Sequence, residues 1–175
     1  LGREVKPVSL LHSTRISEAE LDGVPAQLLE PALDVWFGQR PEGRAVLLPL
    51  FFGPSGALVD YVPERMVSLQ ARHPRARMVL AEAMVLPGEE PVEIVAVLAD
   101  RARAVAKTRG WVKPKVVLCD HGTPLRTVTE VRNRLGASLA DVLRGETLAV
   151  AVASMERREG EAYAFNEPLL ATCLR

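Results

Sequence analysis

A short apolar strand that runs through Asp-His-Gly directly into a helix is the feature that most constrains this chain. Residues 116–119 are strand-forming and apolar, and Asp120, His121 and Gly122 follow at once. Thr123 is predicted to cap the next helix through its hydroxyl, with Pro124 at the first helical position. Apolar residues then recur every three or four positions: Leu125, Val128, Val131, Leu135, Leu139 and Val142. This order places His121 at the carboxyl end of a buried strand, the edge where open α/β sheets bind ligands.

Strand and helix patterns alternate along the whole chain, which is typical of a parallel α/β architecture. The strands are runs of Val, Leu and Ala without polar alternation, as expected for sheets covered on both faces. The fold class predicted is therefore α/β, with parallel sheets flanked by helices. The pattern predicts strands over residues 5–11, 45–52, 77–84, 116–119 and 147–153, and helices over 17–37, 58–72, 91–107, 123–142 and from Asn166 onward.

Composition excludes several classes of function. Lys plus Arg equals Asp plus Glu at 22 each, so no net positive charge favours nucleic acid as a partner. No apolar run approaches the length of a membrane span. The two cysteines, Cys119 and Cys173, lack metal-ligand spacing, and we expect a reduced, cytoplasmic protein. Phosphate-binding loops, Gly-x-Ser-x-Gly elbows and His-Glu-x-x-His helices are absent from the sequence, which argues against nucleotide hydrolases, serine hydrolases and zinc proteases.

Two residues are the main candidates for catalysis. His121 is interpreted as a metal and proton ligand, the alternative being a histidine that only hydrogen-bonds its turn. Glu156 follows the predicted strand that ends near Ser154 and is a candidate metal or proton relay at the same sheet edge. The alternative for Glu156 is an ordinary loop carboxylate.

The other histidines and a nearby arginine pair are weaker candidates. His12 ends a predicted strand but lacks a following glycine, so a ligand role is the less favoured interpretation. His73 closes a predicted surface helix and is interpreted as structural. Arg157 and Arg158 are either contacts for substrate carboxylates or solvated side chains.

Several segments together resemble one enzyme family. The sequence Asp-His-Gly-Thr-Pro at 120–124, with Val-Arg-Asn at 131–133, resembles the His-Gly-Ser/Thr motif of the CbiX/SirB family, the class II tetrapyrrole chelatases. Residues 49–56, leading to 60–64, are similar to the family's Pro-Leu-Phe strand, glycine loop and helix start. Segments 154–158 and 165–170 also resemble parts of longer members with two halves.

The resemblance implies a function. Such enzymes insert cobalt or iron into sirohydrochlorin, a lyase activity of siroheme and cobalamin biosynthesis, with the tetrapyrrole between two α/β halves. The metal would be a substrate, so no permanently held cofactor is expected. Ala57 occupies the position where chelatases place a second histidine, which favours the alternative of a non-catalytic protein that binds a tetrapyrrole or metal.

A faint repeat between residues 7–26 and 150–169 suggests the domain organisation. We predict a first chelatase-like half over residues 1–110, lacking its opening strand and helix, and the opening part of a second, incomplete half over 111–175. An uncovered sheet edge would also favour pairing of two copies in a homodimer.

Overall fold

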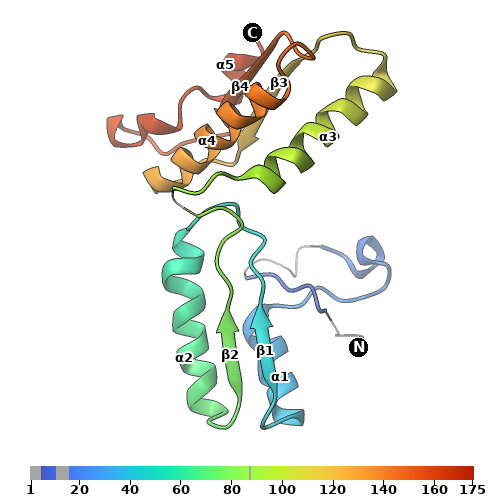
Figure 1. The fold of residues 1–175 in the computed structure, drawn as a ribbon. Coiled ribbons are helices and arrows are strands. Elements are labelled where there is room, and N and C mark those ends of the chain that lie inside the picture. Colours follow the sequence, from blue (N-terminus) through green and yellow to red (C-terminus); the bar gives the residue numbers. More distant parts are fainter. Residues whose placement is uncertain (1–4, 11–15, 87) are drawn as a thin grey trace. The chain divides into compact units, whose positions relative to one another are not determined.

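The computed structural model describes residues 5–10, 16–86 and 88–175 (Figure 1). The chain divides into two compact units, one made of residues 1–49 and 56–82 and the other of residues 50–55 and 83–175. Each unit contains a pair of parallel strands with helices packed against it, which confirms the α/β class. Within the described residues, every helix is too short or too polar to cross a membrane.

The first unit is built on strands β1 and β2, which lie side by side and point the same way (Figure 1). Its helices pack through Phe37 and Leu69, both fully buried. Helix α2 contacts β2 as well as α1. The elements are η2 (Glu18–Leu21), α1 (Leu29–Gln39), β1 (Arg44–Leu47), the π-helical turn η3 (Ala57–Tyr61), α2 (Val62–Arg72) and β2 (Arg77–Leu80).

The second unit is built on strands β3 and β4, also parallel and paired from Lys115 with Ala149 to Asp120 with Ser154. Because both strands end level with each other, the residues that follow them leave the sheet at one edge. The elements are α3 (Val92–Arg109), β3 (Lys115–Asp120), α4 (Arg126–Val142), β4 (Ala149–Ser154), η4 (Glu161–Asn166) and α5 (Leu170–Cys173).

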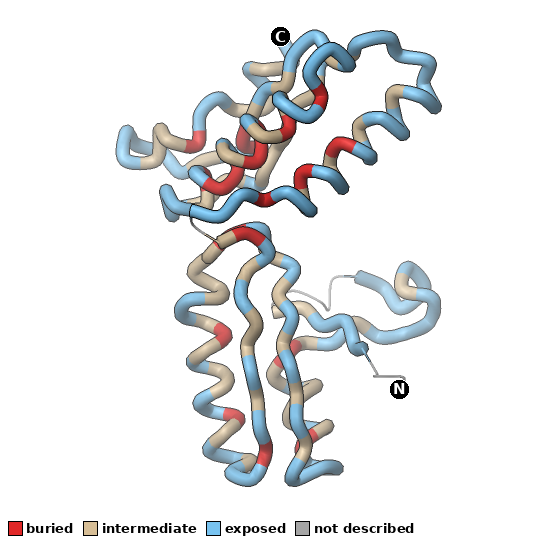
Figure 2. Tube along the Cα trace, viewed as in Figure 1, coloured by how far each residue is buried: buried red, intermediate tan, exposed pale blue. Residues whose placement is uncertain are grey.

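The core of the second unit lies between α3, α4 and the β3–β4 sheet, and buried positions mark α4 in Figure 2. The predicted apolar face of α4 supplies Val131, Leu135 and Leu139, all almost fully buried. At both ends of this face the side chains are exposed to solvent: Leu125, the residue before α4, is 38% exposed, and Val142 is 45% exposed. The periodicity therefore predicted the centre of the helix well and its ends poorly.

Several predicted elements are shorter or placed differently. The strand expected over 45–52 ends at Leu47, two residues before Pro49, which has no N–H for a sheet ladder. The helix expected over 17–37 breaks into η2 and α1 around Pro25. In the described part of segment 5–11, Ser9 makes a single parallel bridge to Leu28 instead of a strand. The helix expected to start near Asn166 begins four residues later, because Asn166 ends η4 and α5 starts at Leu170.

The predicted division into residues 1–110 and 111–175 stays a prediction. In the structure, helix α3 packs against α4 and so joins the second compact unit. The segment 50–55 joins it too, with the backbone N–H groups of Met84 and Val85 donating to the carbonyls of Phe51 and Phe52.

Candidate functional site

His121 and Glu156, the two predicted catalytic residues, lie together just beyond the ends of β3 and β4. The imidazole Nε2 is 3.3 Å from the carboxylate Oε1 of Glu156, and the two side chains are 76% and 71% exposed. A contact between side chains this exposed contributes little to stability. Because both side chains are exposed, each can contact a ligand. The sequence predicted both residues at the same edge of the sheet.

The backbone continues the pairing of the strands past their ends and so sets the separation of His121 and Glu156. The N–H of Met155 donates to the carbonyl of Asp120 at 2.8 Å, and the N–H of Glu156 donates to that of His121 at 3.2 Å. Gly122 has a φ of +101°, and a Cβ placed on it would lie 2.0 Å from the carbonyl oxygen of Glu156. The close approach of the two loops therefore requires glycine at this position.

A buried arginine lies beneath the pair. Arg132 of α4 is 4% exposed. Its Nη1 donates to the hydroxyl of Ser154 at 2.5 Å and to the carbonyl of Asn166 at 3.2 Å. The Ser154 hydroxyl in turn donates to Oδ1 of Asp120 at 2.6 Å. A buried guanidinium needs hydrogen-bond partners for its N–H groups. The partners of Arg132 connect α4 to Ser154 at the end of β4 and, through it, to Asp120 at the end of β3.

Asn166 is fully buried and joins the loop after β4 to the turn that follows His121. Its amide nitrogen donates to the carbonyl of Thr123 at 2.9 Å, and its oxygen accepts from the N–H of Thr123 at 3.0 Å. The predicted helix cap was therefore wrong. With its backbone held by Asn166, Thr123 lies outside the helix, its hydroxyl accepts from the N–H of Leu125, and α4 begins at Arg126.

The capacity of the site for metal is limited to two side chains. Among the described residues, no three His, Cys, Asp or Glu side chains come together as a metal-binding group. Neutral imidazole and carboxylate suit divalent first-row ions. Cys119, on β3, has its Sγ 3.4 Å from the carbonyl of Asp120, and burial raises the pKa of this thiol above its usual range. Cys119 is thus kept protonated near neutral pH and is a poor ligand.

The other predicted residues take structural positions or lie outside the described part. His73 joins α2 to α1 through Oδ1 of Asp34 at 2.8 Å, while His12 lies outside the described residues. Ala57 begins η3 and offers no ligand atom. Arg157 is held by Glu167, with its Nε 2.7 Å from Oε1, and by two backbone carbonyls.

Sequence reasoning missed Arg132, Ser154 and Asn166 as parts of the site. For Arg132 a signal was present: it lies four residues after Val128 and three before Leu135, on the buried stripe of α4. A charged side chain on an apolar stripe implies a buried partner. For Asn166 no local pattern indicates the role in the site, because its two hydrogen bonds to the backbone of Thr123 span 43 residues of sequence.

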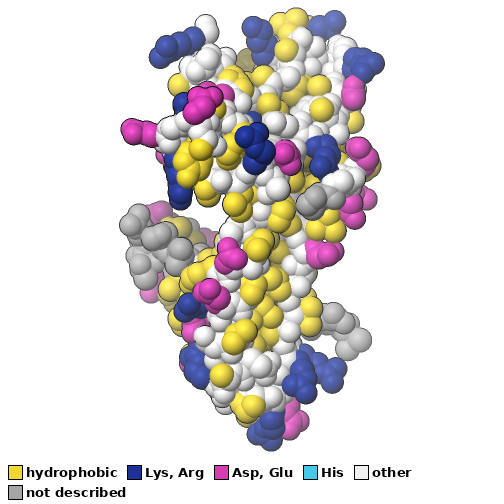
Figure 3. Space-filling model, turned by 90° about the vertical axis from the view of Figure 1, so that its left-hand side faces the viewer, with side chains coloured by type: hydrophobic (Ala, Val, Ile, Leu, Met, Phe, Trp, Pro, Cys, Tyr) yellow, Lys and Arg dark blue, Asp and Glu magenta, His cyan; other side chains and the backbone are white. Residues whose placement is uncertain are grey.

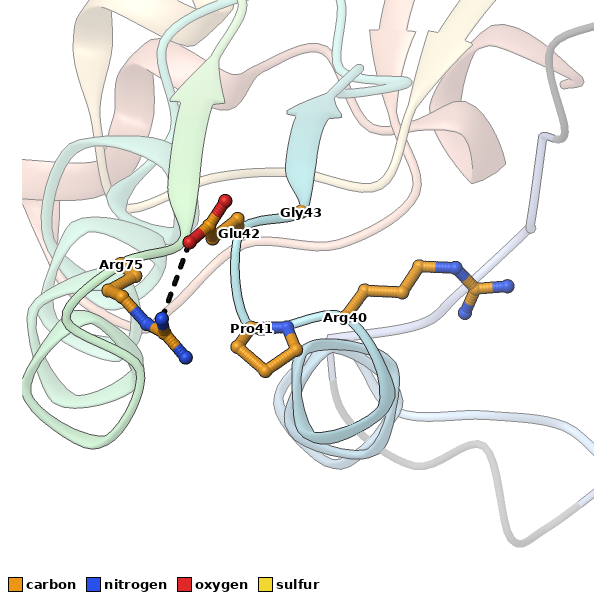
Figure 4. Close-up of a pocket in the computed structure, with 5 residues that line it drawn as sticks. All are labelled: Arg40, Pro41, Glu42, Gly43 and Arg75. Carbon is orange, nitrogen blue, oxygen red and sulfur yellow. Dashed lines mark hydrogen bonds and ion pairs between the residues drawn. The ribbon is translucent and has the colours of Figure 1, made fainter.

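Other surfaces of the molecule offer less chemistry. A hollow of about 460 Å³ in the first unit is lined by Arg40, Pro41, Glu42, Gly43 and Arg75, and its one ion pair joins Arg75 to Glu42 (Figure 4). Arg40 points away from that pair, so the cations do not converge (Figure 4). On the face shown in Figure 3, side chains of both charges are interspersed with hydrophobic ones, as expected for a chain without net charge.

Comparison with known proteins gives one structural likeness. No family model and no curated protein sequence matches the chain. Among solved structures it is similar to CbiX, described as the terminal enzyme for biosynthesis of siroheme in denitrifying bacteria, with a TM-score of 0.47 and 22% identity. The likeness covers 63% of this chain and 45% of CbiX, so this chain spans less than half the length of CbiX. At this level a likeness carries no functional argument, and the proposal below rests on the site and the motifs.

Proposed function

We propose that the chain binds a divalent first-row metal ion between His121 and Glu156 and delivers it into a tetrapyrrole of the sirohydrochlorin type. The observation that carries the proposal is the 3.3 Å separation of Nε2 and Oε1. Two ligand atoms each about 2.1 Å from one ion lie about 3.0 Å apart at an octahedral angle and about 3.4 Å apart at a tetrahedral one. The two side chains can therefore take up one ion with little rearrangement.

The same two groups suit the proton chemistry of metal insertion. As the pyrrole nitrogens bond to the metal they release their N–H protons, and the bonds from the metal to the protein break. The imidazole and carboxylate freed in this way are bases that accept those protons, so charge balances at the site. Because the protein supplies two ligands, water and substrate nitrogens fill the remaining positions on the ion.

The substrate class rests on the resemblance of the motifs. His121 falls in the segment that resembles the family's His-Gly-Ser/Thr motif, and residues 49–56 and 60–64 are similar to its second signature. Cobalt or iron as the metal, a role in siroheme or cobalamin biosynthesis, classification as a lyase and a cytoplasmic location belong to this proposal.

The test is anaerobic absorbance of sirohydrochlorin with cobalt(II) for the wild type, His121→Ala, Glu156→Gln and the control Glu159→Gln. Glu159 is an exposed carboxylate of the same loop. We expect the wild type and control to convert the spectrum faster than the uncatalysed reaction. Loss of the proton acceptor should slow His121→Ala about a hundred-fold or more. Wild-type conversion no faster than in buffer, or full activity of His121→Ala, would contradict the proposal.

A second candidate function is binding without catalysis, and Ala57 favours it. An alanine at the start of η3 supplies no second imidazole where the chelatase pattern has one. In the same experiment, a stable shift of the tetrapyrrole spectrum without conversion would identify this alternative.

A further inference from the structure

Two neighbouring aromatic rings with an arginine against each of them lie on the surface of the second unit. The guanidinium carbon of Arg126 is 4.9 Å from the ring centroid of Phe165, and that of Arg158 is 5.7 Å from the ring of Tyr163. The two rings are themselves 6.4 Å apart. Arg126, Phe165, Tyr163 and Arg158 thus form a continuous series, here named the arginine–aromatic row.

The two arginines of the row differ from their neighbour Arg157 in what they bind. Arg157 donates to Glu167 and to two carbonyls, and it is half-buried. Arg126 and Arg158 are exposed, and within the described part of the chain no carboxylate pairs with either. Contact with a ring restrains each guanidinium while leaving its N–H fork free for a carboxylate.

The residues of the row lie in the segments that follow β3 and β4, as do His121 and Glu156. Arg158 is two residues beyond Glu156, and Arg126 begins α4 five residues beyond His121. Asn166, next to Phe165, binds both backbone groups of Thr123 and so fixes the ring-bearing segment to the turn after His121. The row is therefore held to the loops that carry the proposed metal ligands.

We propose that the arginine–aromatic row binds a planar conjugated polycarboxylate, with Arg126 and Arg158 each receiving a carboxylate. The spacing of two restrained guanidinium groups by two aromatic rings suits a ligand with a flat apolar body and anionic edges. The identification of this ligand with the tetrapyrrole rests on the proposed function. Peripheral carboxylates would then be held by the row while the central nitrogens face the metal ligands.

The test is titration of metal-free sirohydrochlorin, followed by its absorbance, against the wild type, Arg126→Gln, Arg158→Gln and the control Arg101→Gln. Arg101 is an exposed arginine of α3 in the same unit. A charge-assisted hydrogen bond lost at either site should raise Kd about ten-fold or more. Arg126→Lys and Arg158→Lys, which keep the charge but lose the fork, should fall between. Cobalt(II) affinity and thermal stability should be unchanged in all variants.

A second probe separates this inference from the proposed function. Benzenehexacarboxylate is planar and polyanionic but has no metal-binding centre, and backbone NMR shifts on its addition report where it binds. Wild-type affinity for sirohydrochlorin in both Gln variants would overturn the inference and leave the metal proposal standing. If the wild type does not bind sirohydrochlorin, the proposed function fails. Shifts clustered at residues 126, 158, 163 and 165 would then still support the row, and shifts elsewhere or none would overturn it.

Discussion

At the scale of single residues, the backbone of Gly122 decides how closely the loops after β3 and β4 approach. Its φ of +101° and the 2.0 Å between a built Cβ and the Glu156 carbonyl leave no room for a side chain. We expect Gly122→Ala to push the loops apart and weaken cobalt(II) binding about ten-fold or more, as disturbance around metal ligands usually does. Equilibrium dialysis measures this affinity.

The control for that variant is Gly160→Ala. Gly160 has a similar φ of +97° but open space around it, so alanine there adds backbone strain without a collision. Equal losses of metal affinity in both variants would mean that local strain, and not the approach of Gly122 to Glu156, is responsible.

Ser154 tests the buried network under the site. Its hydroxyl accepts from Arg132 and donates to Asp120, and the side chain is fully buried. Ser154→Ala leaves the guanidinium without one partner, which should lower the free energy of unfolding by about 1–3 kcal/mol. Urea denaturation measures the change. Ser138→Ala, at a half-buried α4 serine with no side-chain hydrogen bond in the described structure, should be near neutral.

At the scale of elements, the predictable parts were those fixed by their own sequence. Strand β3 and the centre of α4 follow from a β-branched run and from the spacing of Val131, Leu135 and Leu139. The start of α4 did not follow, because Asn166 holds Thr123 outside the helix from a distant part of the chain. Local capping preference is weak enough for such a tertiary contact to override it.

Two helical glycines give opposite expectations. In α4, a Cβ on Gly136 would lie 2.1 Å from Cγ1 of Val152 on β4, so Gly136→Ala forces helix and sheet apart. We expect a loss of about 1–3 kcal/mol in the free energy of unfolding. In α1, Gly38 has nothing within 4 Å of the built Cβ, and Gly38→Ala should stabilise by about 0.5–1 kcal/mol. Thermal denaturation distinguishes the two, and a stabilising Gly136→Ala would contradict the packing described.

At the scale of the whole molecule, two distant segments share a local geometry. Ser9 makes a parallel bridge to Leu28, the residue before α1, and Ser154 makes one to Leu169, the residue before α5. Both leucines are extended, with ψ of 146° and 148°. Ser9, Ser154 and Leu169 fall within the faint sequence repeat of residues 7–26 and 150–169, and Leu28 lies two residues beyond it. The correspondence favours two related halves, and this organisation and the pairing of two copies stay predictions.

The α/β class was predictable because the alternation of strands and helices repeats along the chain, whereas the compact units were not. Helix α3 reads from its sequence as the close of the first half, yet Val95 and Ala99 pack with Val131 and Leu135 of α4. Whether α3 packs against the helices of the first unit or against α4 depends on how the shapes of the helix surfaces fit together. The hydrophobic periodicity of a helix does not encode that fit.

The central claim is that His121 and Glu156 hold the same metal ion, and a double-mutant cycle on cobalt(II) affinity tests it most directly. The proteins are the wild type, His121→Ala, Glu156→Gln and the double variant, with Glu159→Gln as control. Each single change should weaken binding at least about ten-fold, and the double variant should lose less than the product of the two losses, since both changes break one chelate. Wild-type affinity in either single variant, or losses that multiply as for independent sites, would contradict the claim.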